Sequence, residues 1–220
     1  FADADLDKAV RGLMGSKFRN TGQTCVCANR VFVDKQVLPQ FIEKLEAAMQ
    51  GLKVGVYDEP NVTTGPLINQ ASYEKVSSQV EDAKAKGAKV VMGGNRITKY
   101  ENGYFYEPTI IQDVNESMDM FYQETFGPVV PVIPFENEEK VIEQANDTKY
   151  GLSSYIFTES LDKAIQVSEK MESGIVGIND GTPSVAQAPF GGWKESGIGR
   201  EGGKEGLEEF LEIKYISIQM

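Results

Sequence analysis

Two kinds of hydrophobic pattern alternate along this chain of 220 residues. In some stretches apolar residues recur at helical spacing, which predicts amphipathic helices, and in others they form short β-rich runs, which predict strands. Helices are expected at residues 6–14, 38–49, 69–86, 136–147 and 160–171. Extended segments are expected at residues 30–33, 89–92, 104–111, 129–135, 154–157, 175–178 and 210–218.

The order of these elements predicts the fold class. Strands separated by helices of about 10 to 18 residues indicate βα units, so we expect an α/β fold with a mainly parallel sheet flanked by helices. Proline cannot donate to a sheet ladder, so Pro131 and Pro134 suggest that residues 129–135 form an edge strand or pair irregularly. The alternating apolar residues of 210–218 predict a terminal strand that reaches out to a neighbouring chain.

Charge and composition narrow the chemistry. The formal net charge is −11, which disfavours nucleic acid or an anionic membrane surface as the main partner. The absence of histidine excludes Ser-His-Asp and Cys-His hydrolases. With only two cysteines, no metal site of the usual zinc kinds is expected. Catalysis must therefore use Cys, Glu, Asp, Lys, Arg or Tyr, or groups outside the chain.

The cellular setting follows from the same features. No apolar run is long enough to span a bilayer, and the first residues lack the regions of a signal peptide. Two cysteines separated by one residue are not a secreted disulfide framework, so a cytoplasmic location is expected. The chain begins with Phe1 rather than methionine, and we expect it to be part of a longer gene product.

The first segment suited to chemistry, residues 18–30, contains both cysteines. Cys25 follows a turn rich in Gly, Thr and Asn behind the first predicted helix. Backbone N–H groups and positive charge in such a loop favour thiolate, the nucleophile of covalent catalysis on carbonyls. Alternatively, Cys25 and Cys27 are small buried hydrophobic residues.

Two further segments have candidate binding residues. Residues 123–129 place Glu124 and Phe126 beside a Gly-Pro turn, which either clamps a planar or sugar-bearing ligand or is an exposed turn with a packed Phe. Residues 188–201 place Phe190 and a tryptophan around a glycine pair. This segment either lines a tunnel or is a surface loop whose glycines serve its turns.

Taken together, residues 22–25 (GQTC), 124–128 (ETFGP) and 189–192 (PFGG) resemble the aldehyde dehydrogenase superfamily in their order and intervals. The resemblance covers essentially all of the chain, but only the C-terminal half of a family member. It implies a catalytic domain at residues 1–208 and an oligomerisation strand at 209–220. The family's cofactor-binding domain, general-base glutamate and oxyanion-hole asparagine would lie upstream of Phe1, and Asn20 would only shape its loop.

The resemblance implies a role for several residues. Cys25 matches the nucleophile that forms a thiohemiacetal with the aldehyde, from which hydride passes to NAD or NADP before water hydrolyses the thioester. Its backbone N–H matches half of the oxyanion hole. Glu124 matches the residue that holds the nicotinamide ribose, and Phe126 lies beside it. Phe190 matches a wall of the substrate tunnel.

Within the family, the local sequence is most similar to the succinate-semialdehyde dehydrogenases. Arg19 matches an arginine that binds the distal carboxylate of the substrate, and Ser184 matches a serine that helps it. A guanidinium binds a carboxylate through paired charge-assisted hydrogen bonds; otherwise Arg19 forms a structural ion pair. The resemblance implies a carboxy-aldehyde substrate and a homo-oligomer for the full-length protein, and it predicts that the 220-residue chain alone is inactive.

Three alternatives stay open. Cys27 either forms a strained, easily reduced disulfide with Cys25 that switches activity off, or is a bystander thiol. Cys25 could instead serve a cofactor-independent thiol esterase or peroxidatic activity. The chain could also be a structural module whose terminal strand, residues 211–218, pairs with another sheet edge.

Overall fold

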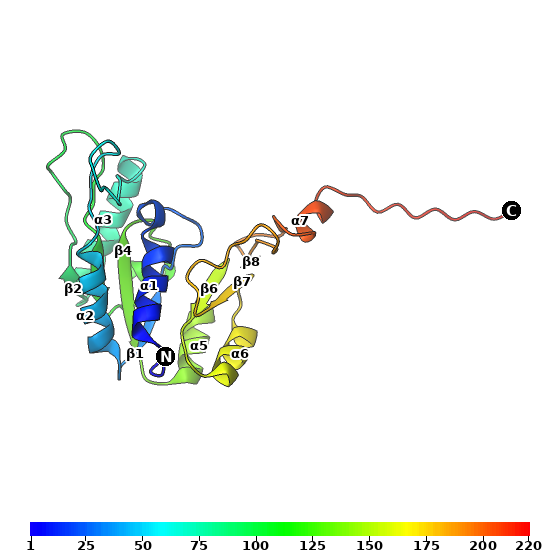
Figure 1. Ribbon diagram of the computed structural model, residues 1–220, viewed down its shortest axis with the longest axis horizontal. Helices are drawn as coiled ribbons and strands as arrows, with labels where there is room; N and C mark the ends of the chain where they lie inside the picture. The colour runs from blue at the N-terminus through cyan, green and yellow to red at the C-terminus, as the bar shows by residue number, and fades with distance from the viewer.

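The main sheet has four strands in the order β1-β4-β3-β2 (Figure 1). The computed structural model describes residues 1–220 and assigns β1 to Val31–Asp34, β2 to Lys89–Met92, β3 to Thr109–Gln112 and β4 to Val129–Phe135. β1 and β3 run parallel to β4, whereas β2 runs antiparallel to β3. The α/β class is therefore confirmed, with a mixed sheet in which two of the three pairings are parallel.

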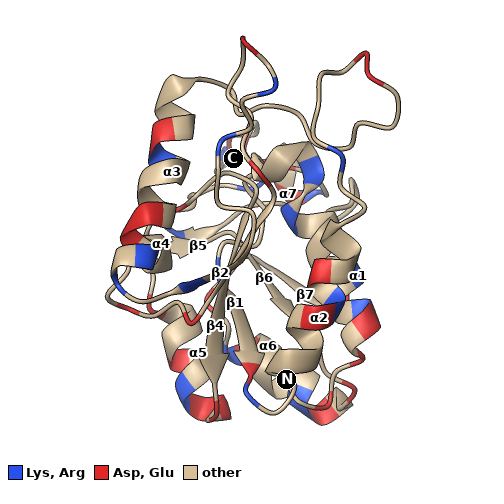
Figure 2. Cartoon of the chain, turned by 90° about the vertical axis from the view of Figure 1, so that its left-hand side faces the viewer, with Lys and Arg blue, Asp and Glu red and all other residues tan.

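Helices cover both faces of this sheet. The helices α1 (Leu6–Lys17) and α2 (Leu38–Met49) share one core with Val130 and Val132 of β4. The helix α3 (Gln70–Ala85) and the short α4 (Asp119–Tyr122) share the other core with Val129 and Ile133. Successive residues of a strand point to opposite faces, so the apolar run of β4 supplies both cores. In Figure 2 acidic and basic residues recur along these helices, whereas the central strands are almost free of them.

The strand with two prolines lies in the interior of the sheet, so the prediction of an edge position is wrong. Pro131 pairs with β3 only, and Pro134 pairs with β1 only, because β1 joins β4 at Val132 and β3 leaves it there. Thr109 N–H donates to Pro128, and Lys35 N–H donates to Phe135. Successive residues of β4 direct their backbone N–H and C=O groups alternately toward β3 and toward β1. With Pro128 facing β3 and Phe135 facing β1, the missing N–H of Pro131 faces the β1 side before β1 begins. The missing N–H of Pro134 faces the β3 side after β3 has ended, so neither proline removes a ladder bond.

A second unit lies beside the main sheet (Figure 1). Its parallel strands are β6 (Ser153–Ile156) and β7 (Ile175–Ile178), and its helices are α5 (Glu138–Asn146) and α6 (Leu161–Lys170). A short antiparallel pair, β5 (Tyr150–Gly151) with β8 (Trp193–Lys194), lies next to it. Residues of β1 and β6 line the same cavity, so β6 is close to the main sheet without pairing with it.

The C-terminal residues extend away from the body of the molecule (Figure 1). After α7 (Glu205–Glu208) the chain is extended, but residues 211–220 form no strand. An extended segment becomes a strand only when another strand pairs with it, and no segment of this chain does so. The side chains of Leu211, Ile213 and Tyr215 are consequently exposed, and the pairing of this segment with another chain stays a prediction. None of the helices has the length and apolar character needed to cross a membrane.

Candidate active site

Cys25 lies on the loop that joins α1 to β1, residues 18–30, which we call the cysteine loop. A 3₁₀ turn at Arg19–Gly22 begins this loop, and Asn20 adopts a left-handed φ of 48°. The Asn20 side chain donates to Gln23 O at 3.0 Å, so it shapes the loop as predicted. Cys25 is an exposed free thiol, and its backbone N–H donates to no group of the chain. The interpretation of Cys25 as a buried hydrophobic residue is therefore wrong, whereas Cys27 is half-buried.

The peptide between the two cysteines is held on both sides. Val26 O accepts hydrogen bonds from Ser16 Oγ, at 3.3 Å, and from Tyr155 OH on β6. Ser16 Oγ in turn accepts from Ala28 N–H at 3.2 Å. No motif or periodicity points to Ser16 or Tyr155, because the hydroxyl of each bonds to a backbone atom of the cysteine loop and is not part of a sequence motif.

Asn29 connects the cysteine loop to the second motif. Its Nδ2 donates to Gln123 O at 3.2 Å, and its Oδ1 accepts from Thr125 N–H at 2.8 Å. One side-chain amide therefore fixes the backbone on both sides of Glu124. The only sequence signal for Asn29 is its position close behind Cys25, and the sequence patterns do not predict this contact.

Glu124 and Phe126 differ in their surroundings. Glu124 is exposed, forms no ion pair or hydrogen bond with the chain, and lines the same cavity as Cys25. Its carboxylate oxygens are free to accept hydrogen bonds from ligand hydroxyls. Phe126 is half-buried outside that cavity, with Lys75 Nζ 5.9 Å from its ring centre.

Two glycines bring residues 22–25 into contact with residues 124–128. A Cβ atom on Gly22 would lie only 2.2 Å from the carbonyl oxygen of Gly127, and Gly22 has a φ of 74°. Both the close approach and the left-handed backbone require a residue without a Cβ. The glycines of the two motifs thus fix the distance between the cysteine loop and the loop of Glu124.

We expect Gly22→Ala to destabilise the chain by about 2–4 kcal/mol, because it adds left-handed strain to a backbone clash. Urea denaturation followed by circular dichroism measures the free energy of unfolding. Gly15→Ala in α1 is the matched control, since its Cβ would meet Thr182 Cγ2 at an ordinary 3.6 Å. A helical Gly→Ala change is expected to stabilise by about 0.5–1 kcal/mol. Equal stabilities of the two variants would contradict the prediction.

Arg19 and Ser184 line a second, smaller cavity of about 290 Å³. Close backbone packing brings them together: a Cβ on Gly181 would lie 2.0 Å from Gly12 O in α1. This contact places residues 181–184 beside the helix that leads into Arg19. Arg19 is exposed and forms no ion pair, so the alternative of a structural ion pair is wrong.

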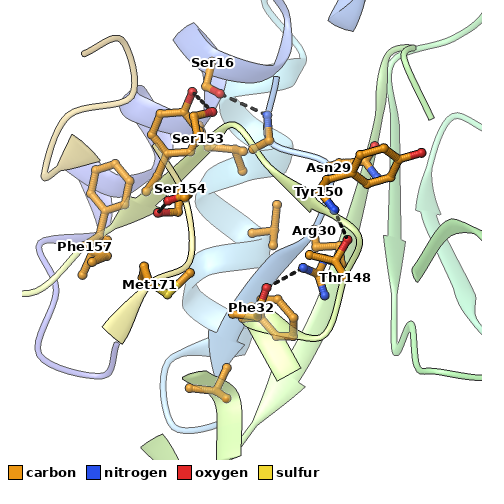
Figure 3. A pocket seen from close by; sticks show the side chains of 18 of the residues that line it. Ser16, Asn29, Arg30, Phe32, Thr148, Tyr150, Ser153, Ser154, Phe157 and Met171 are labelled. Atoms are coloured by element: carbon orange, nitrogen blue, oxygen red, sulfur yellow. Dashed lines mark hydrogen bonds between the residues drawn. The ribbon is translucent and has the colours of Figure 1, made fainter. Parts of the chain in front are cut away.

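The predicted site residues are divided between two adjoining cavities. Cys25, Cys27 and Glu124 line the larger one, of about 490 Å³, part of which is shown in Figure 3. Val26 lines the smaller cavity with Arg19 and Ser184, while Ser16, Tyr155 and Gly181 border both. The cysteine loop therefore forms part of the wall between the two cavities.

Phe190 lines neither cavity. Within residues 188–201, Phe190 and Glu201 exchange two backbone hydrogen bonds, each with an N···O distance of 2.7 Å. The glycine pair next to it does permit close backbone packing, because a Cβ on Gly174 would lie 1.9 Å from Gly191 O. The role of Phe190 as a tunnel wall stays a prediction.

Arg30 lines the larger cavity and connects it to the end of α5. Its guanidinium donates to Gln144 O at 2.8 Å and to Ala145 O at 2.7 Å, at the C-terminal end of α5. Burial lowers the pKa of Arg30, and the charge of Asp147 partly opposes this shift. Figure 3 shows Arg30 beside Phe32, and its guanidinium lies 5.4 Å from that ring centre. Arg30 therefore has a structural explanation in terms of helix capping and stacking.

Comparisons with known proteins identify similar chains. The model of the aldehyde dehydrogenase family matches residues 1–216. An NADP(+) succinate-semialdehyde dehydrogenase of Escherichia coli is 50% identical over 218 residues, which are 99% of this chain and 45% of that protein. A glutarate-semialdehyde dehydrogenase of Pseudomonas putida is 50% identical over 220 residues, 100% of this chain and 45% of that protein.

The likeness extends to solved structures. The crystal structure of succinate-semialdehyde dehydrogenase from Burkholderia pseudomallei superimposes with a TM-score of 0.95 at 47% identity, covering 98% of this chain and 44% of that one. The chain thus spans less than half the length of the curated relatives and of the solved structure that it matches.

Proposed function

Since the chain belongs to the aldehyde dehydrogenase family, we propose that it supplies the nucleophile and substrate-binding part of an NAD(P)-dependent dehydrogenase for carboxy-aldehydes such as succinate semialdehyde. The single observation that carries this proposal is the geometry of Cys25. Its thiol is exposed at a cavity of about 490 Å³, and its N–H is left without a partner in the chain.

In this proposal Cys25 forms the covalent bond. The thiolate sulfur attacks the aldehyde carbon, and the carbonyl electron pair moves to the oxygen to give a thiohemiacetal oxyanion. The free N–H of Cys25 donates to this oxygen as part of an oxyanion hole. After loss of hydride the product is a thioester, which water hydrolyses to the acid. The chain has no histidine, and we assign water activation to a base outside these 220 residues.

Glu124 is proposed to hold the cofactor. Its carboxylate has no partner in the chain and lies at the same cavity as Cys25, which fits a role as acceptor for the ribose hydroxyls. The bound nicotinamide supplies the hydride acceptor of the reaction. Asn29 keeps Glu124 in place relative to the cysteine loop, and we propose that Phe126 supports the same loop.

Arg19 and Ser184 are proposed to bind the far carboxylate of the substrate. The guanidinium is free of ion pairs, and it shares its cavity with a serine hydroxyl. This cavity adjoins the cysteine loop through Val26, so an aldehyde could reach Cys25 while its anionic end stays near Arg19. The relatives named above are dehydrogenases of succinate or glutarate semialdehyde, both of which have a distal carboxylate. Phe190 is proposed to complete this site in the full-length protein.

Turnover measurements test the proposal. We expect the full-length protein to reduce NAD or NADP with succinate semialdehyde, and the 220-residue chain alone to give no turnover with either cofactor. The absorbance of the reduced nicotinamide reports both reactions. Robust turnover by the chain alone would contradict the assignment of the base and most of the cofactor surface to the rest of the protein. No turnover of any carboxy-aldehyde by the full-length protein would contradict the function itself.

The exposed thiol also favours a second activity of the chain alone. A thiolate with a free neighbouring N–H can attack an activated ester without a cofactor. We therefore propose slow esterase activity, which Cys25→Ser should abolish.

Light scattering tests the remaining proposal, that residues 209–220 pair with another copy of the chain. A strict monomer at micromolar concentration would contradict it.

We expect oxidation to link Cys25 to Cys27 and to abolish alkylation of Cys25. Both thiols are free and line the same cavity. Hydrogen peroxide takes up the two electrons and two protons of the thiols and yields two waters and one disulfide. Because a ring with a single intervening residue is strained, dithiothreitol should reverse the reaction readily. Peptide mass spectrometry without an intramolecular crosslink would contradict the switch.

A further inference from the structure

Two hydroxyl groups from distant elements converge on a single backbone oxygen beside the nucleophile. Tyr155 OH and Ser16 Oγ both donate to Val26 O, from positions 129 and 10 residues away in the sequence. Figure 3 shows Ser16 and Ser153 close together at one side of the larger cavity, and Ser153 Oγ donates to Tyr155 OH at 3.2 Å. The Val26 carbonyl therefore ends a short hydrogen-bond chain that starts on β6.

These bonds fix the turn that holds Cys25. Two donors on one carbonyl oxygen restrict the orientation of the Val26–Cys27 peptide plane, which is rigid in itself. On the other side, Cys27 N–H donates to Thr24 O at 3.1 Å and closes the turn. Ser16 Oγ also accepts from Ala28 N–H, so the chain is held just beyond Cys27 as well. Cys25 itself makes none of these contacts, and its thiol and N–H remain free.

We propose that Tyr155 and Ser16 are positioning residues that hold Cys25 in its reactive orientation and slow the formation of a disulfide between Cys25 and Cys27. This inference rests on the proposed function of Cys25. A nucleophile reacts fastest when its position is restricted to the attacking geometry, and residues that support it from behind provide this restriction. The same restriction opposes the backbone rearrangement that a Cys25–Cys27 disulfide requires.

The protonation state of Tyr155 supports the role of donor. Burial raises the pKa of Tyr155; its serine neighbours Ser153 and Ser16 lower it in part, and negative charge on Cys27 and Cys25 raises it again. The phenol therefore stays protonated across the neutral range and keeps its hydrogen bond to Val26 O.

Alkylation of Cys25 by iodoacetamide in the 220-residue chain tests the proposal. The variants are Tyr155→Phe, Ser16→Ala and the double substitution, each with Cys27→Ala so that one thiol reports. We expect the rate constant at neutral pH to fall about two- to tenfold in each single variant, in keeping with the loss of one hydrogen bond. The double variant should fall further, since Val26 O then loses both donors. The matched control is Tyr150→Phe, which removes a hydroxyl that lines the same cavity but bonds to no atom of the cysteine loop.

A second measurement uses both cysteines. In Tyr155→Phe and in the double variant, hydrogen peroxide should form the Cys25–Cys27 disulfide several-fold faster than in the unmodified chain. Unchanged rate constants of alkylation together with unchanged disulfide rates would overturn the proposal, even if the free energy of unfolding falls. Neither assay depends on aldehyde turnover. A failure of the positioning role of Tyr155 and Ser16 and a failure of the proposed dehydrogenase function therefore give different results.

Discussion

Cys25→Ser is expected to lower kcat of the full-length protein by roughly 10³- to 10⁶-fold, the range seen when a covalent nucleophile is removed. A cysteine sulfur is intrinsically far more nucleophilic than a serine hydroxyl, which needs a neighbouring base to lose its proton. Other enzymes activate serine with a histidine base, but this chain contains no histidine. The hydroxyl would therefore occupy the same position without a means of losing its proton.

The neighbouring cysteine provides the control for this experiment. Cys27 is half-buried, and its Sγ donates weak hydrogen bonds to the carbonyl oxygens of Lys17 and Ala28, each at 3.8 Å. Cys27→Ala should leave kcat within about threefold, because a buried free cysteine behaves as a small hydrophobic residue. Turnover with succinate semialdehyde and labelling with iodoacetamide are measured for both variants. Loss of activity in Cys27→Ala, with activity kept in Cys25→Ser, would contradict the assignment of the nucleophile.

Local sequence patterns predicted the elements well where their cause is local. The helix at Leu38–Met49 has the predicted bounds, because proline near its start and a regular apolar stripe determine it. The strand at Val129–Phe135 was also predicted, but its place in the sheet was not. A proline excludes a central position only if its missing N–H faces a neighbour, and that depends on where β1 begins and β3 ends.

The candidate site shows the same division. Motifs pointed to Cys25 and Glu124 as candidates, since the chemistry proposed for each belongs to its own side chain. They did not identify Asn29 and Tyr155, because each of these acts on the backbone of another segment, 94 or more residues away. The terminal residues form no strand within this chain for a related reason: β structure needs a pairing partner, and sequence alternation describes only one of the two partners, so their pairing with another chain stays a prediction.

Arg19→Met is expected to lower kcat/KM of the full-length protein for succinate semialdehyde about 10- to 150-fold, which corresponds to about 1.5–3 kcal/mol for hydrogen bonds to a charged group. Arg19 has no ion pair to lose within the chain, so the change removes only the proposed substrate contact and leaves no carboxylate of the protein without a partner. Ser184→Ala removes one neutral donor and should cost about 2- to 12-fold. Because Arg19 is exposed, added salt should weaken substrate binding in the unmodified enzyme and have less effect in Arg19→Met.

An uncharged aldehyde of similar length separates this role from a structural one. Butanal has no distal carboxylate, so its kcat/KM should be the same in Arg19→Met as in the unmodified enzyme, and the preference for succinate semialdehyde should shrink by the full 10- to 150-fold. Arg19→Lys keeps the charge but loses the planar fork, so its kcat/KM should lie between the two. If both aldehydes lost activity equally, Arg19 would be shaping the loop that leads to Cys25 instead of binding the substrate. The smaller cavity of Arg19 and Ser184 would then have no part in selecting the substrate.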